Sequence, residues 1–309
     1  MIKDISLGTF ARLFDAVEDE VQEFCGDLIS NGDFRYRVIG GKDRDQLILQ
    51  VREKIEDKAL SRSGEDRQPD WETGWRENLD EFVQAGFDVK KLIPKYFQSN
   101  VPARLDGEFI QPLSPDFVFS YTHVYRTWLY RKYFGGARHI YEFGCGPAYQ
   151  LAYLATLFPE TELTGLDWAR SSVAIVGLLR REFGWKVSGR LFDFFQPDPG
   201  LRLHPGSTVL TFGALEQVGQ RHGPFVDYLL ENKPALCVHI ECLEELYEPD
   251  RPLDSLALAY HRRRNYLSGF LSRLRRIEAE GRISILVCHH HRFGNLYDHP
   301  LSYVIWKPR

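Results

Sequence analysis

The chain has 309 residues, 43% of them hydrophobic and 27% charged, which is enough for one large domain or two modest ones. Its formal net charge of −4 lacks the basic character of duplex-binding proteins, so no nucleic-acid partner is predicted. Five cysteines without a CxxC pair, no N-terminal targeting segment and no apolar run long enough to cross a bilayer predict a cytoplasmic protein without a membrane partner. The oligomeric state is left open.

The first 115 residues are predicted to form a smaller, mainly helical domain. Apolar residues at helical spacing predict a helix over residues 4–29, RYRVI predicts a strand, and DQLILQVREKIEDKAL predicts a second helix. The polar segment SRSGEDRQPDW predicts a loop or hinge, and WETGWRENLDEFVQAG a third helix ended by Gly86. The stretch from Pro94 to Pro115 is rich in turn residues, and we place the domain boundary there.

From residue 116 to 309, short apolar runs alternate with helical stretches, which is typical of a mostly parallel sheet. A helix over 116–135 precedes five predicted strands, HIYEF, ELTGLD, VSGRLFD, STVLTFG and ALCVHIE. Helices are predicted to begin near Tyr149, Ser171 and Phe225, and a long one to run from about Ser255 to Glu280. ISILVCHH and LSYVIWKP follow as two strands joined by a short polar loop, so this last pair is antiparallel.

The segment YEFGCGPAYQ places Gly144, Cys145 and Gly146 between a strand and a helix. Such a turn lets the backbone approach a ligand and directs free N–H groups at it. A dinucleotide fingerprint needs a small residue where Tyr149 stands, and Glu142 would repel a pyrophosphate. A carboxylate suits a ligand with an ammonium and a sulfonium, which predicts S-adenosylmethionine as the cofactor; the alternative is a purely structural turn.

Two further acids end the neighbouring strands. Asp167 follows the glycines by about 20 residues, the distance usual for an acid that accepts both ribose hydroxyls, and Trp168 is predicted to cover adenine. Asp193 is predicted to accept from the adenine amino group, with Phe194 as an apolar wall. The alternatives are a helix cap for Asp167 and a capped loop for Asp193.

At this point the sequence resembles the class I S-adenosylmethionine-dependent methyltransferases, over roughly residues 116–309. The first motif of that family, acid-x-Gly-x-Gly-x-Gly, is matched by Glu142, Gly144 and Gly146, with Ala148 in place of the third glycine and Pro147 as a further departure. These departures concern the shape of the methionine end of the site.

The resemblance implies an α/β, Rossmann-like fold with a seven-stranded, mostly parallel sheet and an antiparallel C-terminal hairpin. It also implies that Asp167 and Asp193 are the ribose and adenine acids. GALEQV, which begins with Gly213 and Ala214, looks like the motif that lines the methyl-transfer site.

A looser resemblance covers most of the chain. WETGWRENL, IPKYF, GLDWARSSV, ALEQVG, YHRRRNYLSGFL and SYVIWKP are similar to uncharacterised and sugar-directed methyltransferases of bacterial polysaccharide gene clusters. This resemblance implies O-methylation of a sugar or nucleotide-sugar. The alternatives are an N- or O-methyltransferase of a natural-product scaffold, marked by an apolar pocket without an anion clamp, and a non-catalytic cofactor-binding module.

Transfer to a hydroxyl requires a group that accepts its proton, and the candidates lie at predicted strand ends. Glu216 follows the fourth strand, His239 and Glu241 share a face of the fifth, and His291 follows the sixth. We predict these four as the catalytic side chains.

A metal interpretation of the histidines is weighed and not adopted. His289 and His291 share a face of a strand, with Asp298 or His299 as a third ligand. Because no pair of carboxylates is close by, we favour a strand end that runs into a polar loop, and no metal is predicted.

Substrate-binding residues are predicted in two segments. Tyr121, His123 and Arg126 precede the first strand and form either a lid over the acceptor or part of the core. Arg264 belongs to an arginine cluster that either faces solvent or holds a phosphate or carboxylate of the acceptor. The N-terminal domain is expected to supply the rest of the pocket.

Overall fold

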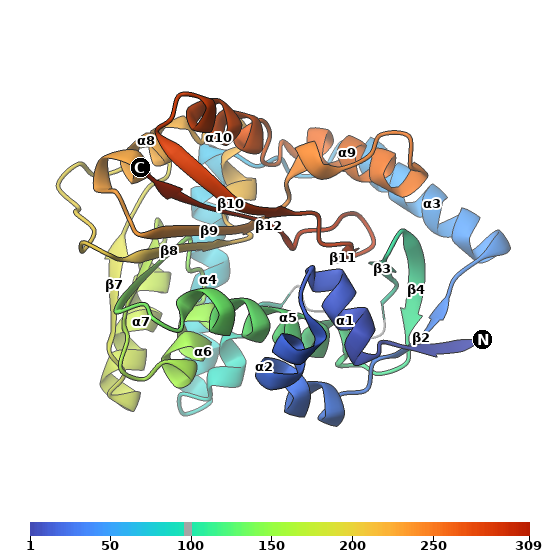
Figure 1. The fold of residues 1–309 in the computed structure, drawn as a ribbon, viewed down its shortest axis with the longest axis horizontal. Coiled ribbons are helices and arrows are strands. Elements are labelled where there is room, and N and C mark those ends of the chain that lie inside the picture. The colour runs from blue at the N-terminus through green and yellow to red at the C-terminus, as the bar shows by residue number, and fades with distance from the viewer. Residues whose placement is uncertain (96–100) are drawn as a thin grey trace.

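A computed structural model describes residues 1–95 and 101–309 of the protein. Its centre is a seven-stranded sheet in the order β10-β12-β9-β8-β5-β6-β7 (Figure 1). β12 (Ser302–Pro308) is antiparallel to both β9 and β10 (Ile283–His289). The other strands are parallel: β5 (His139–Phe143), β6 (Glu162–Asp167), β7 (Val187–Leu191), β8 (Thr208–Phe212) and β9 (Leu236–Glu241). The predicted α/β fold with a mostly parallel sheet and an antiparallel C-terminal hairpin is confirmed.

The order of the strands reverses between β5 and β8. The chain proceeds from β5 through β6 to β7 at one edge and then returns to β8 on the other side of β5. The loops that follow β5 and β8 therefore leave in different directions, and such a switch point opens a crevice at the carboxyl ends of the strands.

The helices between these strands begin close to their predicted positions. They are α6 (Tyr149–Leu157), α7 (Arg170–Phe183) and α8 (Gly223–Asn232). The single long helix predicted over 255–280 is wrong, because the chain forms α9 (Pro252–Arg264) and α10 (Phe270–Ala279). Asn265 adopts a left-handed conformation with φ 56°, which ends α9.

The helix predicted over residues 4–29 is also wrong. A short strand, β1 (Ile2–Asp4), precedes α1 (Leu7–Phe14) and α2 (Glu18–Asn31). The break falls at Asp15, whose φ of 56° turns its N–H onto the carbonyls of Ala11 and Arg12. One asparagine and one aspartate thus decide where two apparently continuous helices stop.

The next elements follow the prediction more closely. They are β2 (Arg35–Val38), α3 (Gly41–Glu56) and α4 (Gln68–Gln84), and α4 begins inside the segment predicted as a loop. Within residues 1–95 and 101–309 the chain also forms short 3₁₀ helices, η1 (Glu65–Arg67), η2 (Val89–Leu92), η3 (Leu215–Val218) and η4 (Glu244–Leu246). Among the described residues, none of the helices combines the length and the apolar character needed to cross a membrane.

A second sheet, in the order β1-β2-β4-β3-β11, was not predicted. β3 (Ala103–Leu105) and β4 (Glu108–Pro112) lie in the turn-rich stretch, of which residues 96–100 fall outside the described residues. β11 (Phe293–Gly294) lies between β10 and β12 in the chain and pairs with β3. β1, β3 and β11 have only two or three residues, too few to show a period in the sequence.

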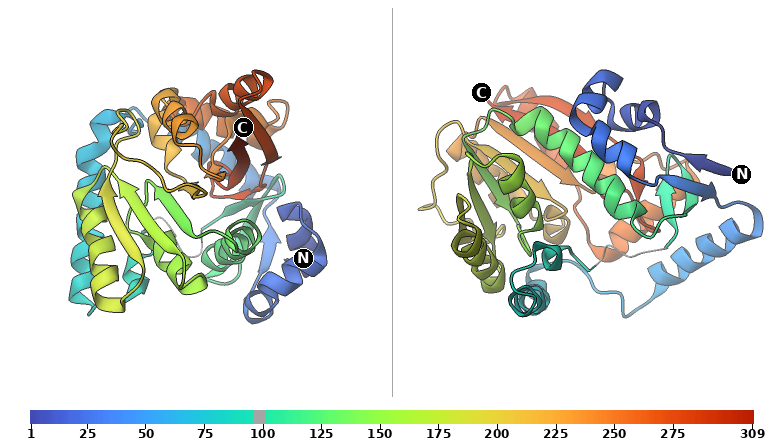
Figure 2. Two further views of the ribbon diagram at one scale, coloured as in Figure 1. Left: turned by 60° about the vertical axis from the view of Figure 1, so that its left-hand side comes forward. Right: turned by 90° about the horizontal axis from the view of Figure 1, so that it is seen from below.

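α5 (Phe117–Phe134) joins the N-terminal helices to the main sheet. Trp128 of α5 contacts the rings of Phe14 from α1 and Tyr303 from β12, and all three are buried. Figure 2 shows α1 and α2 packed outside α5. One hydrophobic core therefore includes both parts of the chain, and the domain boundary at residue 115 stays a prediction.

Candidate functional site

Two glycines shape the turn after β5, and a side chain at either position would displace neighbouring residues. Gly144 and Gly146 have φ angles of 72° and 51°. A Cβ atom on Gly144 would lie 2.4 Å from the Cβ of Ala214, and one on Gly146 would lie 3.0 Å from Trp75. Ala148, at the position of the family's third glycine, also has a positive φ of 57° and caps α6.

Asp167 at the end of β6 fixes this turn. Its Oδ2 accepts a hydrogen bond from the Gly146 N–H at 2.8 Å, and its Oδ1 accepts one from Ala169 N–H at 2.9 Å. Burial raises the pKa of the Asp167 carboxyl to about 6, against the effect of these two donors. The acid predicted to meet a ribose therefore also holds the glycine turn in place.

A pocket of aromatic character lies between these elements, with about 500 Å³ of empty space when open solvent is included. We call it the glycine pocket; its lining residues are Trp71, Trp75, Gly144, Gly146, Asp167, Trp168, Phe192, Phe194, Phe195, Gly213, Ala214, Gln217 and Val218.

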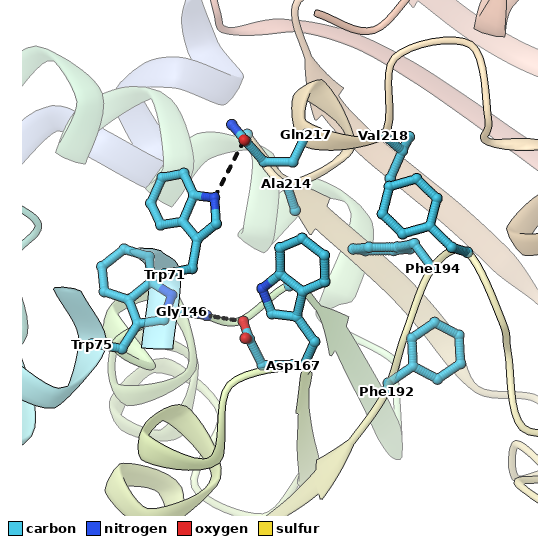
Figure 3. A pocket seen from close by; sticks show the side chains of 13 residues that line it. Trp71, Trp75, Gly146, Asp167, Phe192, Phe194, Ala214, Gln217 and Val218 are labelled. Atoms are coloured by element: carbon cyan, nitrogen blue, oxygen red, sulfur yellow. Dashed lines mark hydrogen bonds between the residues drawn. The ribbon is translucent and has the colours of Figure 1, made fainter. Parts of the chain in front are cut away.

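One wall of the glycine pocket comes from α4, which the sequence did not assign to the site. The rings of Trp71 and Trp75 stack with centroids 5.2 Å apart, and Trp71 Nε1 donates to Gln217 Oε1 at 3.3 Å. Figure 3 shows both tryptophans facing Phe192 and Phe194 across the pocket. The available signal was the spacing in WETGW, since residues four apart lie on one face of a helix.

Hydrogen bonds and an ion pair hold the start of α4 and the residues before it beside the glycine pocket. Glu72 accepts from Ser171 N–H at 3.3 Å, and Ser171 Oγ donates back to the Glu72 carbonyl. Glu65 forms an ion pair with Arg221, whose guanidinium lies 4.6 Å from the centroid of the Phe195 ring. The N-terminal part of the chain therefore covers the site.

The third acid predicted for the cofactor lies differently. Asp193 Oδ1 accepts from Phe195 N–H at 2.8 Å, as in the capped-loop alternative, and the Asp193 carboxylate does not line the glycine pocket. Phe194 lines it, and Trp168 lies 6.1 Å from Phe195 with the rings inclined by 30°. The aromatic rings, rather than an acid, form this end of the pocket.

Glu142 and Cys145 lie beneath the turn and not in its pocket. Glu142 is buried, its Oε2 has no partner among the described residues, and burial together with the charge of Asp167 raises the pKa of its carboxyl well above the usual value. The Cys145 thiol fills the space beside Gly165, and burial raises its pKa well above the usual value.

Glu241, predicted as a catalytic group, holds the backbone of the second turn. Its Oε1 accepts from the N–H groups of Ala214 and Leu215, both at 3.1 Å. Burial raises the pKa of this carboxyl to about 7. Ala214 is the residue that the Gly144 turn approaches most closely, so Glu241 positions one side of the glycine pocket.

Glu216 lies on η3, between the pocket residues Ala214 and Gln217. Burial, followed by the negative charges of Asp298 and Glu241, raises the pKa of its carboxyl to about 8. Of the predicted catalytic side chains, Glu216 is the one whose sequence neighbours line the pocket.

The structure places the two predicted catalytic histidines in the core. His239 Nδ1 forms a hydrogen bond with Thr211 Oγ1 at 3.0 Å, and the His239 ring contacts the rings of Phe270 and Trp306. Burial lowers the pKa of His239 to about 3. Both ring nitrogens of His291 have partners, Tyr121 Oη and the Leu13 carbonyl, each at 3.1 Å. Neither histidine lines the glycine pocket.

The predicted acceptor-binding residues of α5 form hydrogen bonds within the protein, mainly between α5 and α6. Arg126 donates to Gln150 Oε1 at 2.9 Å and to His123 Nδ1, and its guanidinium lies 4.1 Å from the ring of Tyr149. With Tyr121 bonded to His291, none of the three lines the glycine pocket. Their role toward an acceptor stays a prediction.

Arg264 reaches the same side of the sheet as Glu216. Its Nη1 donates to Ser61 Oγ at 2.8 Å and its guanidinium lies 5.0 Å from the ring of Tyr266. Burial lowers the pKa of Arg264, but Tyr266 and Tyr260, followed by the charge of Glu216, raise it above its ordinary value. Arg264 therefore lies near the glycine pocket without lining it.

A buried pair that the sequence did not suggest joins α9 to the loop before β12. His261 Nε2 and Asp298 Oδ2 are 3.0 Å apart, with side chains 1% and 3% exposed. Asp298 thus contacts His261 and not the histidines at the end of β10. Among residues 1–95 and 101–309, no group of three or more His, Cys, Asp or Glu side chains is arranged to hold a metal ion.

No family model matches the chain, and no curated protein matches it. Among solved structures, the plantazolicin methyltransferase BpumL in complex with SAH is 12% identical with a TM-score of 0.40, over 59% of this chain and 79% of that one. Magnesium protoporphyrin IX methyltransferase (ChlM) from Synechocystis PCC 6803 with bound SAM is 14% identical, with a TM-score of 0.41 over 59% and 75% of the two chains. Human N-acetylserotonin methyltransferase in complex with SAM is 11% identical, with a TM-score of 0.38 over 55% and 47%. At these values no likeness decides the activity of this chain.

Proposed function

We propose that this chain is an S-adenosylmethionine-dependent methyltransferase that acts on a small molecule. The observation that carries the proposal is the glycine pocket at the switch point of the sheet, where Gly144 and Gly146 leave room that a Cβ atom would fill. The sequence resemblance and the names of the structural neighbours point in the same direction.

The residues of the pocket fit such a cofactor group by group. The Asp167 carboxylate is an acceptor suited to ribose hydroxyls, and the faces of Trp168 and Phe194 suit an adenine ring. The turn of Gly144 and Gly146 meets the opposite turn of Ala214 closely, which suits the narrow methionine end. When bound, S-adenosylmethionine supplies a methyl group to a nucleophile held in line with it.

The chain's own residues then have separate tasks. Glu216 is proposed to accept a proton from the acceptor, because a carboxyl with a pKa of about 8 is matched to proton transfer near neutral pH. Glu241 is proposed to position the turn that includes Ala214 through its two backbone hydrogen bonds. The tryptophans of α4 exclude water from the pocket.

The finer proposal is O-methylation of a sugar or nucleotide-sugar, and it rests on the looser sequence resemblance. An N- or O-methyltransferase of a natural-product scaffold is the second candidate, because aromatic rings form most of the glycine pocket and no lysine or arginine among the described residues lines it. We place the reaction in the cytoplasm, which the free state of all five cysteines supports.

Calorimetric titration with S-adenosylhomocysteine, beside NADH, tests the cofactor. We expect micromolar binding of the first ligand only, and about tenfold weaker binding in Asp167→Asn, which removes the charge from the acceptor of the ribose hydroxyls. Asp227→Asn, on an exposed surface carboxylate, serves as the matched control. Binding of NADH, or equal affinity in the Asp167 variant, would contradict the proposal.

Turnover separates the catalytic proposal from a binding module. Methyl transfer from labelled S-adenosylmethionine to nucleotide-sugars supports the finer proposal, and transfer to aromatic scaffolds alone supports the second candidate. Cofactor binding without transfer to either class favours a non-catalytic module.

A further inference from the structure

Three neighbouring strands of the main sheet begin or end at one edge beyond Glu216. Because β9 and β10 both run antiparallel to β12, their carboxyl ends lie at the same edge as the start of β12. Tyr247 follows β9, His290 follows β10, and His299 precedes β12. β3, which carries Arg104, pairs with β11 of the same region and belongs to the second sheet (Figure 1).

Arg104 is fully buried without an ion pair among the described residues. Its Nε donates to the Leu296 carbonyl at 3.0 Å and its Nη1 to the Leu253 carbonyl at 2.7 Å. Its Nη2 has no hydrogen-bond partner in the described structure. A buried guanidinium whose hydrogen bonds go only to neutral carbonyl groups is costly, because the charges of Asp298 and Asp254 act on it without direct pairing.

His290 and His299 add four ring nitrogens without partners in the described structure. The two rings lie 5.3 Å apart, and both contact the ring of Tyr247, at 4.7 Å and 5.7 Å. The Tyr247 hydroxyl is occupied by the backbone of His299, since it accepts from His299 N–H at 2.9 Å. An unpaired buried polar atom destabilises the folded protein, so this concentration calls for an occupant.

The unpaired charge of Arg104 favours a negative occupant. Burial and then the charge of Arg104 lower the pKa of His299, while burial and then Arg292 lower the pKa of His290 to about 4. Arg292 forms an ion pair with Glu248, and its Nη1 lies 3.9 Å from Asp254 Oδ2, so its charge is compensated. The charges of Asp298 and Asp254 also act on Arg104, but Asp298 is paired with His261 and neither carboxylate forms an ion pair with Arg104 in the described structure.

We propose that Arg104, His290 and His299 form an anion subsite that takes the carboxylate or phosphate group of the acceptor. This role toward an acceptor rests on the proposed function. Asp298 lies near both regions, because its charge raises the pKa of Glu216 and that of Tyr247 after the larger effect of burial. A phosphate or carboxylate would accept from the free Arg104 Nη2 and from the one ring N–H that each neutral histidine carries. An acceptor that carries such a group, as a nucleotide-sugar does, fits the site better than a neutral aromatic scaffold.

Inorganic phosphate and acetate are the probes, added to the full chain without cofactor while the histidine Cε1–H signals are followed by NMR. We expect saturable shifts of two histidine signals, which His290→Gln and His299→Phe assign. Affinity should fall about tenfold in Arg104→Lys, which keeps the charge but loses the planar fork. Stronger binding of phosphate than of acetate would assign a phosphate group, and the reverse a carboxylate.

His299→Phe guards against a loss of fold, because it keeps a ring against Tyr247 and removes two unpaired nitrogens. It should lose anion binding without loss of thermal stability. Arg282→Gln, at an exposed arginine paired with Glu280, is the control and should leave the affinity unchanged.

Absence of saturable shifts would mean that ordered water alone occupies the site and would overturn the proposal, as would equal affinity in Arg104→Lys and His299→Phe. The titration with S-adenosylhomocysteine is independent of these residues. Its failure beside intact phosphate binding would remove the acceptor role, whereas loss of phosphate binding alone would leave the cofactor proposal standing.

Discussion

The glycine pocket and the anion subsite lie along the same edge of one sheet but differ in how their polar atoms are paired. In the glycine pocket, both oxygens of Asp167 accept from backbone N–H groups, and aromatic rings form most of the remaining walls. In the anion subsite, Arg104, His290 and His299 have ring or guanidinium nitrogens without partners in the described structure.

This difference separates a preformed site from one that a ligand completes. The glycine pocket needs little more than apolar surface and a narrow turn, and both are present in the protein alone. The anion subsite contains donors whose pairing must come from outside the protein. Three substitutions break or sharpen this contrast, in order of decreasing effect.

Gly144→Ala should disrupt the glycine pocket in the protein without ligand. The new Cβ would meet Ala214 Cβ at 2.4 Å with the backbone at φ 72°, so we expect a loss of about 3 kcal/mol in the free energy of unfolding and no detectable S-adenosylhomocysteine binding. Urea denaturation and calorimetry measure the two effects.

Gly206→Ala is the matched control for that change. Its φ is 76° and the space around it is open, so only backbone strain of about 1–2 kcal/mol is expected, with cofactor binding retained. Equal destabilisation in the two variants would contradict the close approach of the Gly144 and Ala214 turns.

Glu216→Gln tests the carboxyl that lies between the two regions. Between its ordinary pKa of 4.5 and about 8, the folded protein holds a proton that the unfolded chain releases, so this group lowers stability as pH rises through that window. The variant should therefore be more stable than the parent at pH 9, by about 2 kcal/mol, and equally stable at pH 4.

The same variant should lose about 100-fold in methyl-transfer rate, while the parent's rate rises with pH up to about 8. Thermal melts across pH and initial rates measure these effects, with the exposed Glu231→Gln as control. A stability difference that does not change with pH would show that Glu216 is ionised in the folded protein throughout this range.

Glu65→Gln should have the smallest effect. It removes an exposed ion pair with Arg221 at the rim of the glycine pocket, which is worth well under about 1 kcal/mol. Stopped-flow release of a fluorescent cofactor analogue should become about twofold faster, whereas Glu77→Gln, which loses an exposed pair with Lys95, should not change it. No change in Glu65→Gln would mean that this pair does not help to cover the pocket.

The local part of the site could be predicted from the sequence. β5 and β6 occupy the residues expected for them, and the turn of Gly144 and Gly146 has the positive φ angles that its glycines suggested. Asp167 lies beside that turn, as its spacing indicated. These features depend on residues within the consecutive elements β5, α6 and β6, where periodicity and glycine positions carry the information.

Helix ends and short strands could not be predicted from the sequence pattern. A single residue in the left-handed conformation breaks each of two predicted helices, at Asp15 and Asn265, and the surrounding apolar pattern does not change there. β3 and β11 are too short for a period, and they exist because they pair with each other across the molecule.

The sequence by itself determined the strands of the sheet, its reversed last strand and the glycine turn. Each of these features can be recognised from residues that are close together in the chain. Only the tertiary structure decided which distant groups complete the two sites: the tryptophans of α4 over the glycine pocket, and Arg104 beside His290 and His299. The physical reason is that burial and electrostatic environment depend on which segments meet, and no spacing along the chain records that meeting.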